Sequence, residues 1–304
     1  MAPEAIPFDT CDPLLDWRAL TRALLAGHRM PRAQISDTVL RRGGDAILSR
    51  AAMIDGLGSL VKTATVFPGN ADRALPTVNG MVTLFDDATG LPEALIDFHL
   101  VTKWKTAADS LLAAQCLARP DSRNITILGS GTVAQSLIAA YSAGFPGARF
   151  TIWSRRLEQA QALAAQHLGA IAQADAQTAV AGADIIATAT LATQPVLKGA
   201  WLQPGQHVDL IGAYRADMRE ADDTAMARAR VFVDSFDTTI SHIGELMAPI
   251  SAGVISPDDV IADFYQPDRF KRHSDEEITL CKNGGGAHLD LMTSRYILDV
   301  WNAA

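Results

Sequence analysis

The chain has 304 residues, of which 48% are hydrophobic and 20% are charged, and its formal net charge at pH 7 is −8. This length allows two domains of ordinary size, and the hydrophobic content excludes a disordered chain. The negative charge argues against a nucleic-acid partner, and no apolar run approaches the ~20 residues that span a bilayer. The N-terminus also lacks the pattern of a secretory signal, so we expect no membrane partner.

The spacing of cysteine and histidine argues against two further classes of protein. Cys11, Cys116 and Cys281 are an odd number without paired spacing, which predicts reduced thiols in a cytoplasmic protein. The seven histidines include no pair at HxH or HxxxH spacing. We therefore expect no metal site.

The first third of the chain is predicted to form a helix followed by antiparallel strands. Residues 16–30 have helical periodicity, with Trp17 and Leu24 on one side. Alternating apolar residues then predict four strands, at residues 46–53, 60–67, 77–85 and 91–97. A helix follows at residues 99–118 and ends before Pro120, which cannot continue it.

From residue 125 onward, strands and helices alternate. The predicted strands are residues 125–128, 149–153, 183–189, 208–211 and 231–234, and the predicted helices include 157–167, 240–252 and the C-terminal tail. Such alternation is typical of a parallel sheet covered on both faces. The fold class is therefore α/β, with a Rossmann-type dinucleotide-binding domain at residues 119–283. A separate α+β domain comprises residues 1–118 and is completed by the C-terminal helix, 284–304.

The strand at residues 125–128 leads directly into a glycine motif. Gly129, Gly131 and Ala134 have the G-x-G-x-x-[GA] spacing that opens a helix and accepts a dinucleotide pyrophosphate. The N–H groups around Thr132 and Val133 would face the diphosphate at the positive end of that helix. A glycine turn without a ligand is the alternative, and the flanking strand and helix patterns favour the dinucleotide.

About 20 residues later, the second strand of this unit ends at a basic pair. A cofactor with a free ribose 2′-hydroxyl usually meets Asp or Glu there, but this chain has Ser154, Arg155 and Arg156. A guanidinium matches a 2′-phosphate by bidentate hydrogen bonding. NADPH is therefore preferred to NADH as the cofactor, although a solvated arginine pair at the start of a surface helix is the alternative.

Three cations lie where periodicity predicts apolar side chains. Arg50 and Lys62 are on the apolar faces of their strands, and Lys105 is on the apolar stripe of its helix. A buried cation is costly unless it is paired, so three together indicate a pocket for a carboxylate substrate. On this interpretation Lys62 has no partner without substrate, and Lys62→Met would leave folding intact. Pairing with an internal carboxylate such as Asp97, or exposure at an edge, is the alternative.

Several residues follow predicted parallel strands, where α/β enzymes bind their ligands. Thr188 and Thr190 are placed to hydrogen-bond the cofactor, and Tyr214 is placed to approach the nicotinamide. The loop that contains Gly285 is placed to close over it, with Asp290 as the cap of the following helix.

These residues resemble those of a known family. The stretches that carry the resemblance to the ornithine cyclodeaminase/mu-crystallin family are residues 61–63, 66–70, 75–76, 84–86, 89–90, 102–110, 129–134 and 212–222. The resemblance implies a homodimer whose N-terminal domain carries the substrate and the dimer contact. It places the substrate lysine at Lys62, a second cation at Lys105 and the carboxylate-binding arginine at Arg50.

The family includes ornithine cyclodeaminases, alanine dehydrogenases and NADPH-dependent reductases of cyclic ketimines. Where cyclodeaminases have Asp after Gly-Gly, this chain has Tyr214, which resembles the reductases. The implied activity is reduction of Δ1-pyrroline-2-carboxylate or Δ1-piperideine-2-carboxylate to L-proline or L-pipecolate. The alternatives are a cyclodeaminase, an alanine-type dehydrogenase, or a crystallin-like protein that only binds NADPH and a small ligand.

Overall fold

The computed structural model describes residues 3–304, which form two compact units. Unit 1 comprises the chain up to Lys105 together with Gly285–Ala304, and unit 2 comprises Thr106–Gly284. Helix α3 (Phe98–Leu117) crosses the first boundary. The sequence analysis placed this boundary after residue 118, because Pro120 ends the helix. In the structure, unit 1 ends at Lys105 and unit 2 begins at Thr106, inside the helix.

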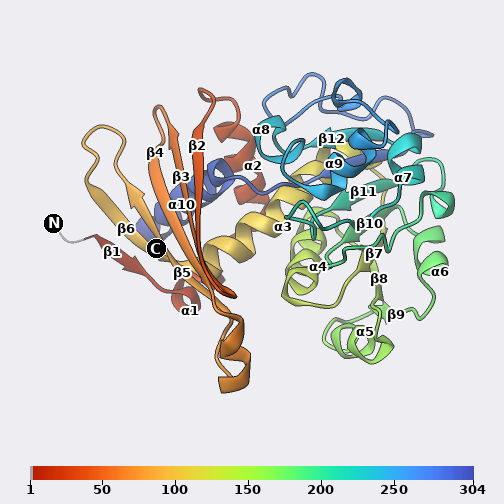
Figure 1. Ribbon diagram of the computed structural model, residues 1–304, viewed down its shortest axis with the longest axis horizontal. Helices are drawn as coiled ribbons and strands as arrows, with labels where there is room; N and C mark the ends of the chain where they lie inside the picture. Colours follow the sequence, from red (N-terminus) through yellow and green to blue (C-terminus); the bar gives the residue numbers. More distant parts are fainter. Residues whose placement is uncertain (1–2) are drawn as a thin grey trace. The chain divides into compact units, whose positions relative to one another are not determined.

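Unit 1 is built on a six-stranded sheet with the order β1-β6-β5-β4-β3-β2 (Figure 1). Its strands are β1 (Glu4–Ile6), β2 (Gln34–Arg42), β3 (Asp45–Ile54), β4 (Gly58–Val66), β5 (Val78–Phe85) and β6 (Pro92–Asp97). β1 runs parallel to β6, and all other neighbours are antiparallel. The four strands predicted in this region are confirmed. The edge strands β1 and β2 were not predicted, because their side chains are mostly exposed and leave little apolar alternation.

Helices cover one face of this sheet. Unit 1 contains α1 (Phe8–Cys11), α2 (Trp17–Gly27) and α10 (Ala287–Ala303), and α10 packs against α2 and strands β2–β5. The strand side chains that face this layer, such as Leu60, Val82 and Ile96, are buried. On the opposite face, Ile47 and Met53 are exposed.

Unit 2 contains a seven-stranded parallel sheet with the order β12-β13-β11-β10-β7-β8-β9. Its strands are β7 (Asn124–Leu128), β8 (Arg149–Trp153), β9 (Ile171–Ala172), β10 (Ile185–Thr188), β11 (His207–Leu210), β12 (Arg230–Val233) and β13 (Thr279–Lys282). The first strand, β7, lies between β8 and β10, so the chain reverses its direction of winding there. This arrangement confirms the predicted α/β fold with a Rossmann-type domain.

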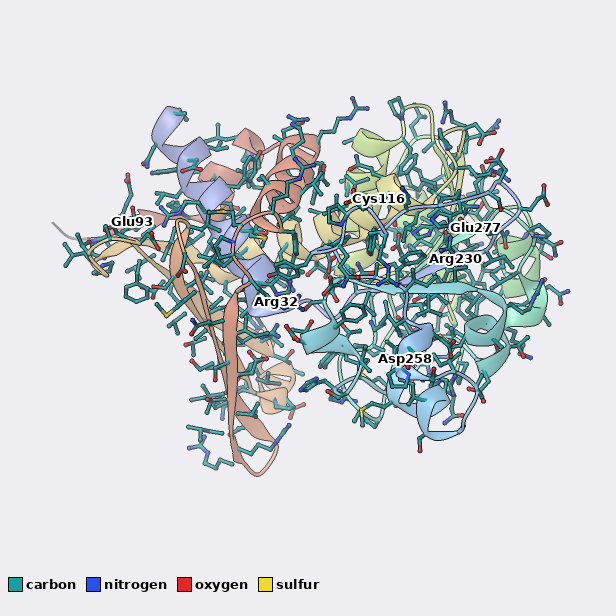
Figure 2. The ribbon with its side chains drawn as sticks, turned by 90° about the horizontal axis from the view of Figure 1, so that it is seen from above. Arg32, Glu93, Cys116, Arg230, Asp258 and Glu277 are labelled. Carbon is teal, nitrogen blue, oxygen red and sulfur yellow. The ribbon has the colours of Figure 1, made fainter. Side chains whose placement is uncertain are left out.

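The helices of unit 2 connect these strands. They are α4 (Thr132–Gly144), α5 (Leu157–Ala164), α6 (Ala176–Ala181), α7 (Asp223–Arg228), α8 (Phe236–Thr239) and α9 (Gly244–Ser251). Figure 2 labels Arg230 at the start of β12 and Glu277 just before β13, and their side chains form an ion pair at 2.8 Å. The pair ties together the beginnings of two neighbouring strands.

One helix prediction is wrong. The chain does not form a continuous helix over residues 240–252; α9 begins only at Gly244. The N–H of Gly244 donates to the carbonyl of Arg215, and a Cβ there would lie 2.4 Å from the carbonyl oxygen of Ala216. This close approach of a distant segment fixes the helix start, and periodicity cannot reveal it.

Candidate functional site

The three cations that break the apolar pattern lie close together in unit 1. Arg50 on β3 and Lys62 on β4 are directly opposite each other in the antiparallel pair. Lys105 is on α3, at the last position of the helix that belongs to unit 1. Lys62 and Lys105 are both buried. The charges of Lys105 and Arg50 both act on Lys62. The predicted cluster of cations is therefore present within one unit.

Lys62 has a carboxylate partner that the sequence analysis did not identify. Its ammonium group donates to Asp290 Oδ1 at 2.9 Å and to Thr102 Oγ1 at 2.9 Å. It also lies 4.8 Å from the centre of the Phe98 ring. The second oxygen of Asp290 is 4.0 Å from a guanidinium nitrogen of Arg50. One buried carboxylate thus lies between two of the three cations.

The geometry corrects the predicted role of Asp290 and rules out the alternative role considered for Asp97. Asp290 does not cap α10; it lies inside the helix, and its side chain is buried against Lys62. Asp97 is not the internal counter-ion, because its carboxylate accepts from the N–H groups of His99 and Leu100 at the start of α3. The prediction that Lys62 lacks a partner is also wrong, and this removes the reason for expecting Lys62→Met to leave folding intact.

Burial and like charges tune this cluster. Burial lowers the pKa of Lys62 to about 8, and the charges of Lys105 and Arg50 act in the same direction, against the opposing effect of Asp290. Burial alone would raise the pKa of Asp290, but the three cations outweigh it and hold the pKa below its usual range. Three cations face two carboxylates, Asp290 and the Asp37 that pairs with Arg50, and the remaining excess of positive charge favours an anionic ligand.

Gly285 lies with the cations in unit 1. Its carbonyl accepts from Arg50 Nη1 at 2.7 Å and from Lys105 Nζ at 3.3 Å. Its φ of +70° is unfavourable for other residues, and a Cβ would lie 2.7 Å from Lys105 Nζ. The guanidinium of Arg50 also pairs with Asp37. The glycine therefore allows its carbonyl to orient two of the cations.

The glycine motif of unit 2 has the geometry that a dinucleotide requires. Gly129 has φ +140°, and a Cβ there would lie 2.4 Å from the carbonyl oxygen of Ala189, so the turn excludes larger residues. Gly131 is the N-cap residue of α4, where no side chain caps the helix, and there is open space where its Cβ would be. The N–H groups of Thr132, Val133 and Ala134 lie in that first turn, where a helix offers no acceptor. This end of the helix can bind a diphosphate.

A cavity of about 260 Å³ adjoins this turn. It is lined by residues that follow three neighbouring strands: Gly129 and Ser130 after β7, Ser154, Arg155, Arg156 and Gln159 after β8, and Ala189, Thr190, Leu191 and Ala192 after β10. A second hollow of about 340 Å³ lies over the start of α4. The carboxyl ends of β7, β8 and β10 thus form a cleft at the point where strand order reverses, which is where such folds bind ligands.

The remaining predicted cofactor residues have different surroundings. Thr190 lines the cavity, but its N–H and hydroxyl both donate to Glu220. Thr188 is buried at the end of β10 and is absent from the cavity lining. Tyr214 is exposed and accepts a hydrogen bond from Arg215, whose guanidinium pairs with Asp217.

The sequence analysis missed two site residues, and the sequence carries a signal for only one of them. Asp290 falls on the buried stripe of α10 with Ala287 and Ser294, so a charge at that position implied a buried partner. Glu220 lies in the loop after β11, where no periodicity applies.

Among residues 3–304, no group of His, Cys, Asp and Glu is arranged to hold a metal ion, and no helix is both long and apolar enough to cross a membrane.

Comparison with known proteins identifies relatives along nearly the whole chain. The model of the ornithine cyclodeaminase/mu-crystallin family matches residues 51–304. A Δ1-pyrroline-2-carboxylate reductase of Paracoccus denitrificans is 51% identical, with 98% of this chain and 97% of the relative covered. The enzyme of the same name from Colwellia psychrerythraea is 35% identical, with 78% of each chain covered.

A solved structure has the same fold over nearly its full length. The archaeal alanine dehydrogenase dimer with bound NAD superposes with a TM-score of 0.91 and 26% identity. The alignment covers all of this chain and 97% of the dehydrogenase. The likeness extends over both units.

Proposed function

Because the chain belongs to the ornithine cyclodeaminase/mu-crystallin family, we propose that it is an oxidoreductase that reduces a small cyclic imine carboxylate with a nicotinamide dinucleotide. The substrate is Δ1-pyrroline-2-carboxylate or Δ1-piperideine-2-carboxylate, and the product is L-proline or L-pipecolate. The observation that carries this proposal is the cluster of Arg50, Lys62 and Lys105 in a chain that is 51% identical to a Δ1-pyrroline-2-carboxylate reductase.

The cations of unit 1 are the groups that hold the substrate. A carboxylate is attracted by the excess positive charge, and each charge-assisted hydrogen bond is worth about 1.5–3 kcal/mol. Fixing the carboxylate orients the C2 carbon of the ring, so the gain is mainly one of proximity. With a pKa of about 8, Lys62 can also exchange a proton near neutral pH, and it is our first candidate for the proton donor.

Unit 2 holds the dinucleotide, which supplies the hydride when it is bound. The turn at Gly129 and Gly131 and the first turn of α4 receive the diphosphate. Arg155 and Arg156 line the neighbouring cavity, where they match a ribose 2′-phosphate, so NADPH is the proposed cofactor. Ser154 lies beside them and accepts a hydrogen bond from Ser130.

The other activities of the family fit the chain less well. A cyclodeaminase needs an acid after the glycines that follow β11, and this chain has the exposed Tyr214 there. The next carboxylate, Asp217, is exposed and paired with Arg215. A protein that only stores NADPH and a small ligand would not need three cations at one site.

We also propose that two copies associate through the open face of the unit 1 sheet. Leu40 and Ile47 are cross-strand neighbours on this face, and Leu40, Met53 and Met81 are 65%, 60% and 48% exposed. Large exposed apolar patches mark protein interfaces, and these four side chains lie on one face of the sheet. The alanine dehydrogenase with the same fold is described as a dimer.

The free thiols of Cys11, Cys116 and Cys281 favour a reducing, cytoplasmic location.

The decisive test is oxidation of NADPH by the purified protein with a panel of imines. We expect turnover with Δ1-pyrroline-2-carboxylate and Δ1-piperideine-2-carboxylate, and formation of L-proline or L-pipecolate. The control is Δ1-pyrroline, which has the same ring but no carboxylate for the cations to hold. NADPH binding without oxidation by any carboxylated imine would indicate a binding protein instead.

A further inference from the structure

Glu220 gathers four hydrogen bonds from two separate loops of unit 2. Its Oε1 accepts from the N–H and the hydroxyl of Thr190, each at 2.7 Å. Its Oε2 accepts from the N–H groups of Gly212 and Ala213, at 2.6 and 3.2 Å. The side chain is fully buried. A single carboxylate thus fixes the backbone of both loops.

The two loops follow neighbouring strands. Thr190 follows β10 and Gly212 follows β11, and these strands are adjacent and parallel, so both loops lie at the carboxyl edge of the sheet. Thr190 lines the cavity beside the glycine turn. The packing is close, since a Cβ on Gly212 would lie 2.2 Å from the carbonyl oxygen of Thr190 and 2.5 Å from Glu220 Oε1.

A second buried carboxylate fixes Glu220 itself. Glu245, on α9, accepts from the N–H groups of Glu220 and Ala221 at 2.8 and 2.9 Å. The charge that opposes both carboxylates is Lys282, which is buried at the end of β13 and donates to the carbonyl of Leu210 at 2.7 Å. Burial raises the pKa of Glu245 to about 7, with Lys282 opposing and Glu220 adding to the rise.

We propose that Glu220 is a positioning residue that holds the loops after β10 and β11 in the shape that receives the nicotinamide half of the dinucleotide. The proposal rests on the proposed function only in that unit 2 binds such a cofactor. Both oxygens of Glu220 are occupied by Thr190, Gly212 and Ala213, so it acts through these loops. The diphosphate turn and the arginine pair lie after β7 and β8, and the four hydrogen bonds of the Glu220 carboxylate go to Thr190, Gly212 and Ala213 instead, so these two segments do not depend on Glu220 for their backbone shape.

The test compares two ligands that differ in the nicotinamide half. In Glu220→Gln an amide N–H₂ replaces one acceptor oxygen and faces the N–H donors of one loop, which then moves away. We expect NADPH to bind about tenfold more weakly by calorimetry, whereas 2′,5′-ADP, which lacks the nicotinamide half, changes by less than about twofold. In turnover, the KM for NADPH should rise while the KM for the imine stays unchanged.

The matched control is Asp223→Asn, which removes a carboxylate charge three residues away that pairs with Arg219 and touches neither loop. It should leave both ligands unaffected. If Glu220→Gln weakens both ligands equally, or weakens neither, the proposal is wrong. If that variant does not fold, Glu245→Gln, which loosens the backbone of residues 220 and 221, should give the same selective loss at smaller size. Binding needs no turnover, so failure of imine reduction would leave this test intact.

Discussion

Lys62 Nζ and Asp290 Oδ1 lie 2.9 Å apart and form a buried ion pair between the middle of β4 and the C-terminal helix. The two residues are 228 positions apart in the chain. The Asp290 carboxylate thus lies beside the Lys62 ammonium group, which we propose binds the substrate carboxylate. Lys62 is therefore both a member of the core of unit 1 and a substrate-binding group.

Replacing Lys62 should destabilise unit 1. In Lys62→Met the carboxylate of Asp290 stays buried without its closest cation, and breaking a buried pair costs about 3–5 kcal/mol. Urea unfolding should show a clear fall in the midpoint. The double variant Lys62→Met/Asp290→Leu removes both charges and should recover most of the stability while staying inactive. A single variant as stable as the parent protein would mean that the pair contributes nothing to folding.

Imine reduction should lose efficiency as the pH rises through about 8. Burial lowers the pKa of Lys62 from its ordinary 10.5 to about 8, so the free protein loses this charge above that pH. The profile of kcat/KM reports groups of the free enzyme. Lys62→Arg keeps its charge at high pH and should abolish this alkaline limb, whereas Asp290→Asn should move the limb to lower pH. An unchanged limb in both variants would assign it to another group.

The same pKa shift predicts a change in stability. The pKa of Lys62 is about 8 in the folded protein and 10.5 in the unfolded chain. Its contribution to stability is fully present above pH 10.5 and is lost as the pH falls through about 8, because the unfolded chain binds the proton more tightly. The free energy of unfolding should therefore increase, by the contribution of Lys62, as the pH rises from about 8 to 10.5. Comparing the pH dependence of urea unfolding in the parent and in Lys62→Met isolates the contribution.

Cofactor preference should depend on the basic pair after β8. We expect NADPH to bind more tightly than NADH by at least ~2 kcal/mol, because the guanidinium groups of Arg155 and Arg156 match the 2′-phosphate. Arg155→Asp should narrow the preference in binding titrations. Arg149→Asp is the control, since Arg149 lies at the opposite end of the same strand. Equal affinity for the two cofactors in the parent protein would remove the argument.

Ornithine should be a poor substrate. Incubation of L-ornithine with NAD should release little ammonia compared with the rate of imine reduction, because the loop after β11 has Tyr214 where cyclodeaminases have an acid. Asp217→Asn should leave imine reduction unchanged, as its carboxylate is exposed and paired with Arg215. Rapid ammonia release that Asp217→Asn abolishes would assign the acid to Asp217.

Association should depend on the open face of the unit 1 sheet. Met53→Glu places a charge in the exposed apolar surface and should shift the protein to a monomer in sedimentation velocity. Leu168→Glu, at a fully exposed position of unit 2, is the control and should leave the mass unchanged. A parent protein that already sediments as a monomer would contradict the proposed dimer.

Local rules were enough to predict most elements and the cofactor turn. The spacing of Gly129, Gly131 and Ala134 needs only neighbouring residues, and the apolar periods of strands and helices are equally local. The cations Arg50, Lys62 and Lys105 were found for the same reason, since each violates the period of its own element. Whether a residue breaks the apolar period of its element can be seen from the neighbouring residues alone.

The partners of those residues were decided by tertiary structure alone. Asp290 reaches Lys62 only because α10 returns to the sheet of unit 1, and Asp97, which is nearer in sequence, is occupied with capping α3. Glu220 collects donors from two loops for which no periodic signal exists. An ion pair or a shared carboxylate depends on distance in space, and many sequence separations are compatible with the same local pattern. Composition and periodicity therefore show that a buried charge needs a partner, and the packing of the chain decides which residue supplies it.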